Sequence, residues 1–161
     1  MENIWQLHSL FDFFHPIITD MSPITDTVFI SDWNSSLNFD KLVSHNIHTI
    51  ICLNELTKGD YYIDEYRKRN IHHHHFYMWD DPSSDLSLIL DPIIDLILNS
   101  PSNCLIHCSA GCSRSVAVAI YYLCRVLNYS LYSSCQHIIK ARPCSGPLKS
   151  YLQQIYNKLY P

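Results

Sequence analysis

Apolar positions along the chain follow two patterns, short continuous runs and longer segments with helical spacing. The short runs have the length of buried strands and lie at 27–30, 48–53, 71–79 and 104–107. The longer segments predict helices at 60–69, 85–98, 114–127, 130–142 and 147–159. Because strands alternate with helices, we expect an α/β fold of three layers, in which helices flank a central, twisted, mostly parallel sheet.

The N-terminal part predicts two more helices. Residues 3–14 carry apolar side chains at close to helical spacing. Ser35 or Ser36 is suited to cap a helix that runs to about Asn46. No internal repeat or low-complexity linker interrupts the chain, and its length suits one hydrophobic core. We therefore expect a single domain over 1–161, with residues 1–20 as an N-terminal helical extension.

Composition and charge narrow the class of protein. The formal net charge is −4, and no basic run is visible, which argues against nucleic acid as the main partner. The seven cysteines are an odd number and form no CxxC pair, which favours free thiols in a reducing compartment. No secretory signal is visible, and no apolar stretch reaches the roughly 18 residues of a membrane span. We expect a cytoplasmic or nuclear protein that does not bind membranes.

The segment at 104–115, CLIHCSAGCSRS, carries the candidate chemistry. A short apolar strand ends at His107, five residues separate Cys108 from Arg114, and a buried helix begins there. The backbone N–H groups of such a loop, next to a helix N-terminus, suit a phosphate dianion. Gly111 gives the loop backbone freedom, and Arg114 can bind two phosphate oxygens at once. The same positive field should stabilise a thiolate at Cys108, so a nucleophile and a phosphate cradle meet at one point.

The sequence at 107–115, HCSAGCSRS, resembles the HCxxGxxRS signature of the protein tyrosine phosphatase superfamily, specifically its dual-specificity branch. The likeness covers about residues 25–158, the expected catalytic core. Three further segments resemble stretches of that family: 27–32, 70–80 and 142–155. Ser31 stands where Gly is common, Leu148 replaces Asn, and Ser150 replaces Gly. The resemblance implies a small stand-alone dual-specificity phosphatase catalytic domain, similar to atypical and poxvirus-type members.

The resemblance also implies a mechanism in two steps. Cys108 attacks phosphorus to give a phosphocysteine, which water hydrolyses while Ser115 hydrogen-bonds the departing thiolate. Arg114 and the loop amides stabilise charge on the equatorial oxygens. His107 is implied to be a buried residue that orients the loop. No cofactor and no metal are implied. The residues expected to bind phosphate are Ser109, Ala110, Gly111, Cys112, Ser113 and Arg114.

Two acids compete for the role of proton donor to the leaving group. In the family pattern the donor lies six residues before an apolar residue that follows Asp or Asn. Asp85 and Leu86 supply that pair, so Asp80 is favoured. Asp81 is interpreted as a loop residue before Pro82, or as a helper that orients the loop.

Other histidines and cysteines raise alternative hypotheses. The histidines of 72–75 alternate across a strand, so only two could bind one ion, which favours a polar strand over a metal site. A zinc knot of the cysteines in 104–112 with His107 is disfavoured, because they lie on a strand end, a loop base and a loop top. Cys52 or Cys104 could rescue an oxidised nucleophile as a disulfide, although a small buried hydrophobic residue is the simpler interpretation.

Loop composition defines the expected substrate. Phospholipid phosphatases of the superfamily carry Lys inside the loop, and RNA 5′-phosphatases usually show HCTHGxNRT; residues 109–113 match neither. The resemblance therefore implies a phosphoprotein substrate and a shallow pocket open to phosphotyrosine, phosphoserine and phosphothreonine. A non-catalytic phosphopeptide-binding module on the same fold is the alternative, which intact Cys108, Arg114 and Asp80 disfavour. By analogy with poxvirus-type members, residues 3–14 are a candidate homodimer contact.

Overall fold

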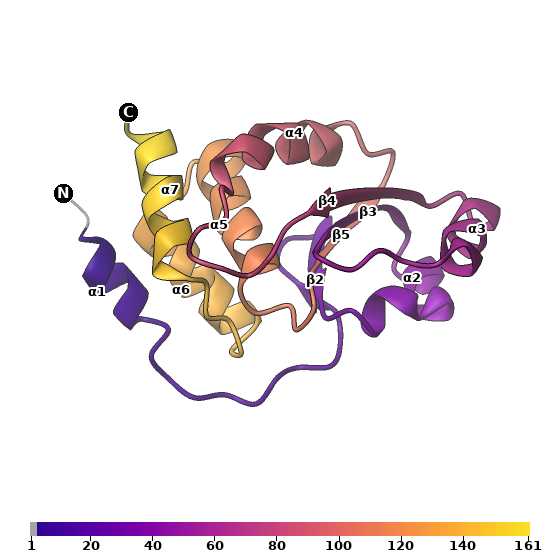
Figure 1. Cartoon of the computed structure of the whole chain (residues 1–161), viewed down its shortest axis with the longest axis horizontal. Helices are drawn as coiled ribbons and strands as arrows, with labels where there is room; N and C mark the ends of the chain where they lie inside the picture. Colours follow the sequence, from indigo (N-terminus) through magenta and orange to yellow (C-terminus); the bar gives the residue numbers. More distant parts are fainter. Residues whose placement is uncertain (1–2) are drawn as a thin grey trace.

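A five-stranded sheet lies between helices in the computed structural model, which describes residues 3–161 (Figure 1). The strands are β1 (Ser22–Pro23), β2 (Val28–Ser31), β3 (Ile47–Asn54), β4 (His72–Tyr77) and β5 (Asn103–His107). They stand in the order β1-β2-β5-β3-β4, in which β1 pairs antiparallel with β2 and the other pairs are parallel. The expected α/β architecture with a mostly parallel sheet is confirmed.

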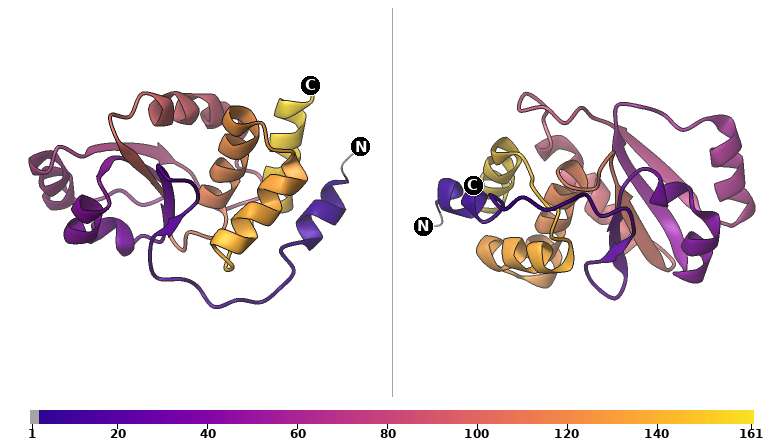
Figure 2. Two further views of the ribbon diagram at one scale, coloured as in Figure 1. Left: turned by 180° about the vertical axis from the view of Figure 1, so that it is seen from behind. Right: turned by 90° about the horizontal axis from the view of Figure 1, so that it is seen from below.

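The helices divide between the two faces of the sheet. They are α1 (Ile4–Ser9), α2 (Phe39–Ser44), α3 (Asp60–Lys68), α4 (Ser87–Leu98), α5 (Arg114–Leu127), α6 (Leu131–Ala141) and α7 (Lys149–Leu159), with a 3-10 turn η1 (Ser35–Leu37). Helices α2 and α3 lie on one side of the sheet, and α4 to α7 lie on the other (Figure 2). None of the helices formed by residues 3–161 is long and apolar enough to cross a membrane.

Alternate side chains of the central strands supply two separate cores. Ile51 and Ile106 face the larger core, which α4 to α7 complete. Ile50 and Leu105 face the smaller core on the side of α2 and α3. Helix α5 is buried almost all round, as its apolar pattern predicts, so it runs through the larger core. Its first residue, Arg114, is therefore held next to the carboxyl ends of the strands, where α/β proteins bind ligands.

The N-terminal region differs from its prediction in two places. The helix expected at 3–14 ends at Ser9, and the chain then crosses below the helices without regular structure (Figure 1). The cap predicted at Ser35 or Ser36 is wrong, because these residues form a 3-10 turn. Asn38 caps α2 instead, with its side-chain oxygen accepting a hydrogen bond from the N–H three residues later, at 3.1 Å.

Candidate active site

The loop between β5 and α5 brings Cys108 to the start of the buried helix. Cys108 is buried, and its Sγ lies 3.2 Å from the Oγ of Ser115 in the first turn of α5. Gly111 has a φ of +68°, in the left-handed region, and a Cβ there would collide with the carbonyl of Ser31. Glycine is therefore required both by the backbone conformation and by the close approach of β2.

The guanidinium of Arg114 is buried beside the loop and is held by three neighbours. Its Nη1 donates to the Glu55 carboxylate and to the Met78 carbonyl oxygen, the latter at 2.7 Å. Its Nη2 donates to Ser109 Oγ at 3.1 Å. Although burial raises the pKa of Glu55, the hydrogen bond from Arg114 leaves it below the usual value. The Nε of Arg114 is buried without a hydrogen-bond partner, so one strong donor is left for an anion.

The two candidate acids occupy different environments in the loop between β4 and α4. Asp80 accepts a hydrogen bond from Ser113 Oγ at 2.8 Å, which brings its carboxylate to the loop between β5 and α5. Asp81 turns away and accepts hydrogen bonds from the hydroxyl and the N–H of Ser83, which together lower its pKa. The Tyr151 hydroxyl donates to the Trp79 carbonyl at 3.2 Å and so anchors the loop between β4 and α4.

Residues 28–159 match the family model described as dual specificity phosphatase, catalytic domain. This chain belongs to the dual-specificity phosphatase family. The phosphatase is 30% identical over 146 residues to dual specificity protein phosphatase 18 of Bos taurus, covering 89% of this chain and 74% of that one. It is 33% identical over 81 residues to dual specificity phosphatase 28 of Mus musculus, covering 48% and 50% of the two chains. The family resemblance drawn from the loop sequence is confirmed.

Solved structures agree with the fold of the phosphatase. DUSP15 superposes with a TM-score of 0.79 at 21% identity, covering 89% of each chain. Human DUSP28 gives a TM-score of 0.76 at 20% identity, covering 90% of this chain and 94% of that one. At these identities the likeness establishes the architecture, whereas the roles of individual residues depend on the site itself.

Beneath the loop of the phosphatase, His107 is fixed by hydrogen bonds on both ring nitrogens. Its Nδ1–H donates to the Cys108 carbonyl at 3.0 Å, and its Nε2 accepts from Lys58 Nζ at 2.6 Å. Burial, followed by the positive charge of Lys58, holds the pKa of His107 well below its usual value. A neutral imidazole in one tautomer therefore links the buried lysine to the backbone of Cys108.

A group of three side chains in this region has the spacing of metal ligands. Cys52, His73 and His107 each place one ligand atom within 4.8 Å of the others, and they are the single such group of three within residues 3–161. Lys58 Nζ hydrogen-bonds His107 and lies 3.2 Å from His73 Nε2, so the group already surrounds a cationic side chain. Its fit to a second cation is poor, because the two positive charges would repel each other.

The histidines of β4 make a hydrogen bond and a ring contact within the protein. His75 on β4 donates to the Asn54 carbonyl at 2.8 Å, and His73 stacks on Tyr66 with ring centroids 5.4 Å apart. Burial raises the pKa of both the Cys52 and the Cys104 thiols, which makes them less reactive. These contacts agree with a structural role for each.

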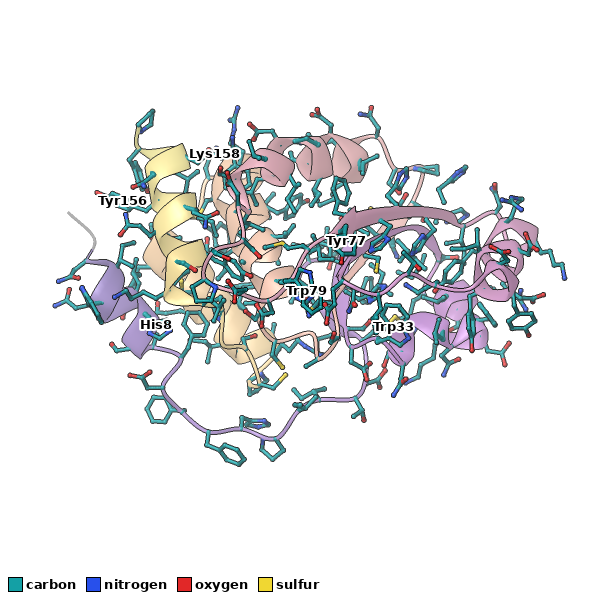
Figure 3. All side chains as sticks on the ribbon, viewed as in Figure 1. His8, Trp33, Tyr77, Trp79, Tyr156 and Lys158 are labelled. Carbon is teal, nitrogen blue, oxygen red and sulfur yellow. The ribbon has the colours of Figure 1, made fainter. Side chains whose placement is uncertain are left out.

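Several site residues were not identified from the sequence. Asn54 ends β3 and donates to Ser109 Oγ at 2.7 Å, next to the Glu55 carboxylate. Trp33 follows β2, donates its backbone N–H to the Ser109 carbonyl at 2.9 Å, and sets its ring edge-on to His107. Trp33 and the exposed Trp79 are visible over the middle of the molecule in Figure 3. The sequence signal that could have identified Trp33 and Trp79 is their position, because each follows the carboxyl end of a strand.

Proposed function

We propose that this phosphatase hydrolyses phosphotyrosine, phosphoserine and phosphothreonine in proteins through a phosphocysteine intermediate. Two groups at the loop carry the proposal. One is the buried Cys108 thiol, and the other is a buried N–H of Arg114 that has no hydrogen-bond partner. A phosphate dianion would accept from that N–H and from the loop amides while its phosphorus faces the sulfur. The family to which the chain belongs supports the same reaction.

In the first step, the Cys108 thiolate attacks phosphorus in line with the leaving oxygen. An S–P bond forms, the P–O bond to the leaving group breaks, and Asp80 gives its proton to the leaving oxygen. The position of Asp80, hydrogen-bonded to Ser113 at the end of the loop, supports this role. Arg114 and the N–H groups of residues 109–113 stabilise the charge on the equatorial oxygens.

In the second step, water attacks the phosphocysteine and the S–P bond breaks. Asp80, now a carboxylate, takes the proton of the water as inorganic phosphate forms. The Ser115 hydroxyl, 3.2 Å from the sulfur, donates a hydrogen bond to the thiolate as it leaves. Ser115 thus lowers the energy of the departing group in this step more than in the first.

The experiment is hydrolysis of para-nitrophenyl phosphate with a chelator present, combined with rapid acid quenching and mass spectrometry of the peptides. The wild type should turn over without metal and carry a phosphoryl group on Cys108, and Cys108→Ser should lose both signals. Asp80→Asn should lower kcat by about a hundredfold or more, since it removes the acid. Asp81→Asn is the matched control and should keep most of the activity.

Turnover that survives in Cys108→Ser, or that the chelator abolishes in the wild type, would contradict the mechanism. A folded wild type that binds phosphopeptides without turnover would instead favour the phosphopeptide-binding module. A panel of matched peptides carrying phosphotyrosine, phosphoserine or phosphothreonine then measures the substrate range. Activity confined to phosphoinositides or to RNA 5′-ends would exclude a phosphoprotein substrate.

The proposal extends to location and assembly. The seven cysteines are an odd number and include no CxxC pair, which supports a reducing compartment such as the cytoplasm or the nucleus. Helix α1 buries Ile4 and Leu7 in the larger core and leaves Trp5 69% exposed, which supports α1 as the contact with a second copy. Light scattering across a range of concentrations measures whether the dimer forms.

A further inference from the structure

Two thiols with no part in the proposed reaction face each other behind the phosphate-binding loop. Cys112 belongs to the loop, and Cys144 lies in the turn between α6 and α7. Their Sγ atoms are 3.2 Å apart. The N–H of Gly146 donates to the Cys112 carbonyl at 2.7 Å, so the two backbones are also joined. Neither residue is fully buried, so small reagents can reach the pair.

The surroundings of the pair lower the pKa of Cys144 and raise the pKa of Cys112. The hydrogen bond from the Cys112 thiol is the main cause of a lowered pKa at Cys144, with an opposing effect of burial. The N–H of Ile18 and the positive charge of Arg142 lower it further. A thiolate that accepts a hydrogen bond from a neighbouring thiol is the arrangement found in redox-active dithiols.

We propose that Cys112 and Cys144 form a reversible disulfide that regulates phosphate binding by the loop. The site would react with a peroxide. The Cys144 thiolate attacks one peroxide oxygen and the O–O bond breaks, which gives a sulfenic acid and, after proton uptake, one water. The Cys112 sulfur then attacks the sulfenic sulfur, the S–S bond forms, and a second water leaves. Two thiols and one peroxide thus give one disulfide and two waters, and a dithiol reductant reverses the change.

The consequence for the loop follows from the distance that the sulfurs must cover. A disulfide has an S–S length of about 2.05 Å, so the pair must close by roughly 1 Å. Cys112 lies in the loop whose amides would hold the phosphate, and Gly111 beside it has no free space toward Ser31. Moving Cys112 should therefore displace the cradle, and displacements of this size reduce binding and turnover strongly. This regulatory effect rests on the proposed function, whereas formation of the disulfide does not.

The first test is to expose the whole protein to hydrogen peroxide, block free thiols and map the linked peptides by mass spectrometry. We expect a peptide that joins Cys112 to Cys144 in the wild type and also in Cys108→Ser, because the nucleophile is not required. Cys144→Ser should abolish the link. Ser145→Ala is the matched control, since it removes the Ser145 hydrogen bond to the Arg142 carbonyl in the same turn and keeps both thiols.

The second test measures binding of inorganic phosphate to the Cys108→Ser protein by calorimetry, so that catalysis is not needed. Oxidation should weaken binding by about tenfold or more, and dithiothreitol should restore it. The Cys108→Ser, Cys144→Ser double variant should bind phosphate equally well before and after oxidation. A folded wild type that never links the pair, or a linked protein that binds phosphate unchanged, would overturn the proposal. A reduced wild type that shows no turnover, but that still forms the link on oxidation, would count against the proposed function alone.

Discussion

At the scale of the residue, Lys58 places an ammonium group in the core beneath the loop. Lys58 is only 8% exposed and contacts His107, His73 and the ring of Trp33. Burial lowers its pKa to about 8, although the neighbouring Cys52 favours the charged form. A buried charge with such neighbours makes the stability of the protein depend on pH.

The prediction concerns the pH range between two pKa values. These are about 8, the pKa of Lys58 in the folded protein, and 10.5, the pKa of an exposed lysine. In this range the unfolded chain keeps the Lys58 proton and the folded protein has lost it, so the unfolded state binds more protons. The contribution of Lys58 to the free energy of unfolding therefore rises with pH there, by about 3 kcal/mol. Lys58→Met should remove this rise, as measured by urea unfolding at a series of pH values.

Other groups titrate in the same range, so the quantity to follow is the difference between wild type and variant. Lys68→Met is the control, because Lys68 is exposed and pairs with Glu65 on the surface of α3. This control should leave the pH dependence close to that of the wild type. A difference between wild type and Lys58→Met that stays flat from pH 8 to 10.5 would contradict a depressed pKa at Lys58.

At the scale of the element, the loop between β5 and α5 depends on one glycine. Gly111→Ala would place a Cβ against the Ser31 carbonyl at a backbone conformation that alanine rarely adopts. We expect a loss of about 1–3 kcal/mol in the free energy of unfolding, together with a marked loss of turnover. Urea unfolding and para-nitrophenyl phosphate hydrolysis measure the two effects.

Gly59 offers a matched control for this substitution. A Cβ at Gly59 would meet nothing within 4 Å, and its φ is −65°, which alanine adopts without strain. Gly59→Ala should therefore change stability and turnover little. Equal effects of the two substitutions would show that the loop does not need glycine at residue 111.

The elements themselves could largely be predicted, because the period of the apolar pattern distinguishes strands from helices locally. The order of the strands could not, since it depends on contacts between distant segments. Strand β5 lies between β2 and β3, in a register that sets Cys52 opposite His107. This register places Asn54, Glu55 and Lys58 beside the loop. Their roles depend on that pairing, for which the sequence has no local signal.

The loop between β5 and α5 could be predicted from the sequence, because its candidate chemical groups lie close together along the chain. A short strand, a loop with Cys and Arg at fixed spacing, and a buried helix occupy one continuous segment at 104–127. The same holds for the prediction of Asp80, because the family pattern locates the proton donor by counting along one loop. The Cys112–Cys144 pair could not be predicted in this way, because 32 residues separate the two thiols that the fold brings together. Only the tertiary structure could reveal it.

At the scale of the whole molecule, the side chain of Arg142 joins three parts of the chain. It is fully buried at the end of α6. Its Nε donates to the Gly111 carbonyl, in the loop between β5 and α5, at 2.7 Å. Its Nη1 and Nη2 donate to the carbonyls of Asp20 and Ile18 in the N-terminal segment, each at 2.8 Å. One guanidinium thus ties the loop, the N-terminal segment and the helical layer together.

Arg142→Lys tests whether this connection holds the molecule together. Lysine keeps the charge, but its compact ammonium cannot reproduce the planar set of donors, so several buried carbonyls would lose their partners. We expect a loss of about 3–5 kcal/mol in the free energy of unfolding. Where the variant still folds, turnover should fall as well, because the Gly111 carbonyl loses its support. Arg67→Met is the control, since Arg67 is exposed and pairs only on the surface with Asp64. Similar stability of the two variants would mean that the N-terminal segment and the loop are held independently of Arg142.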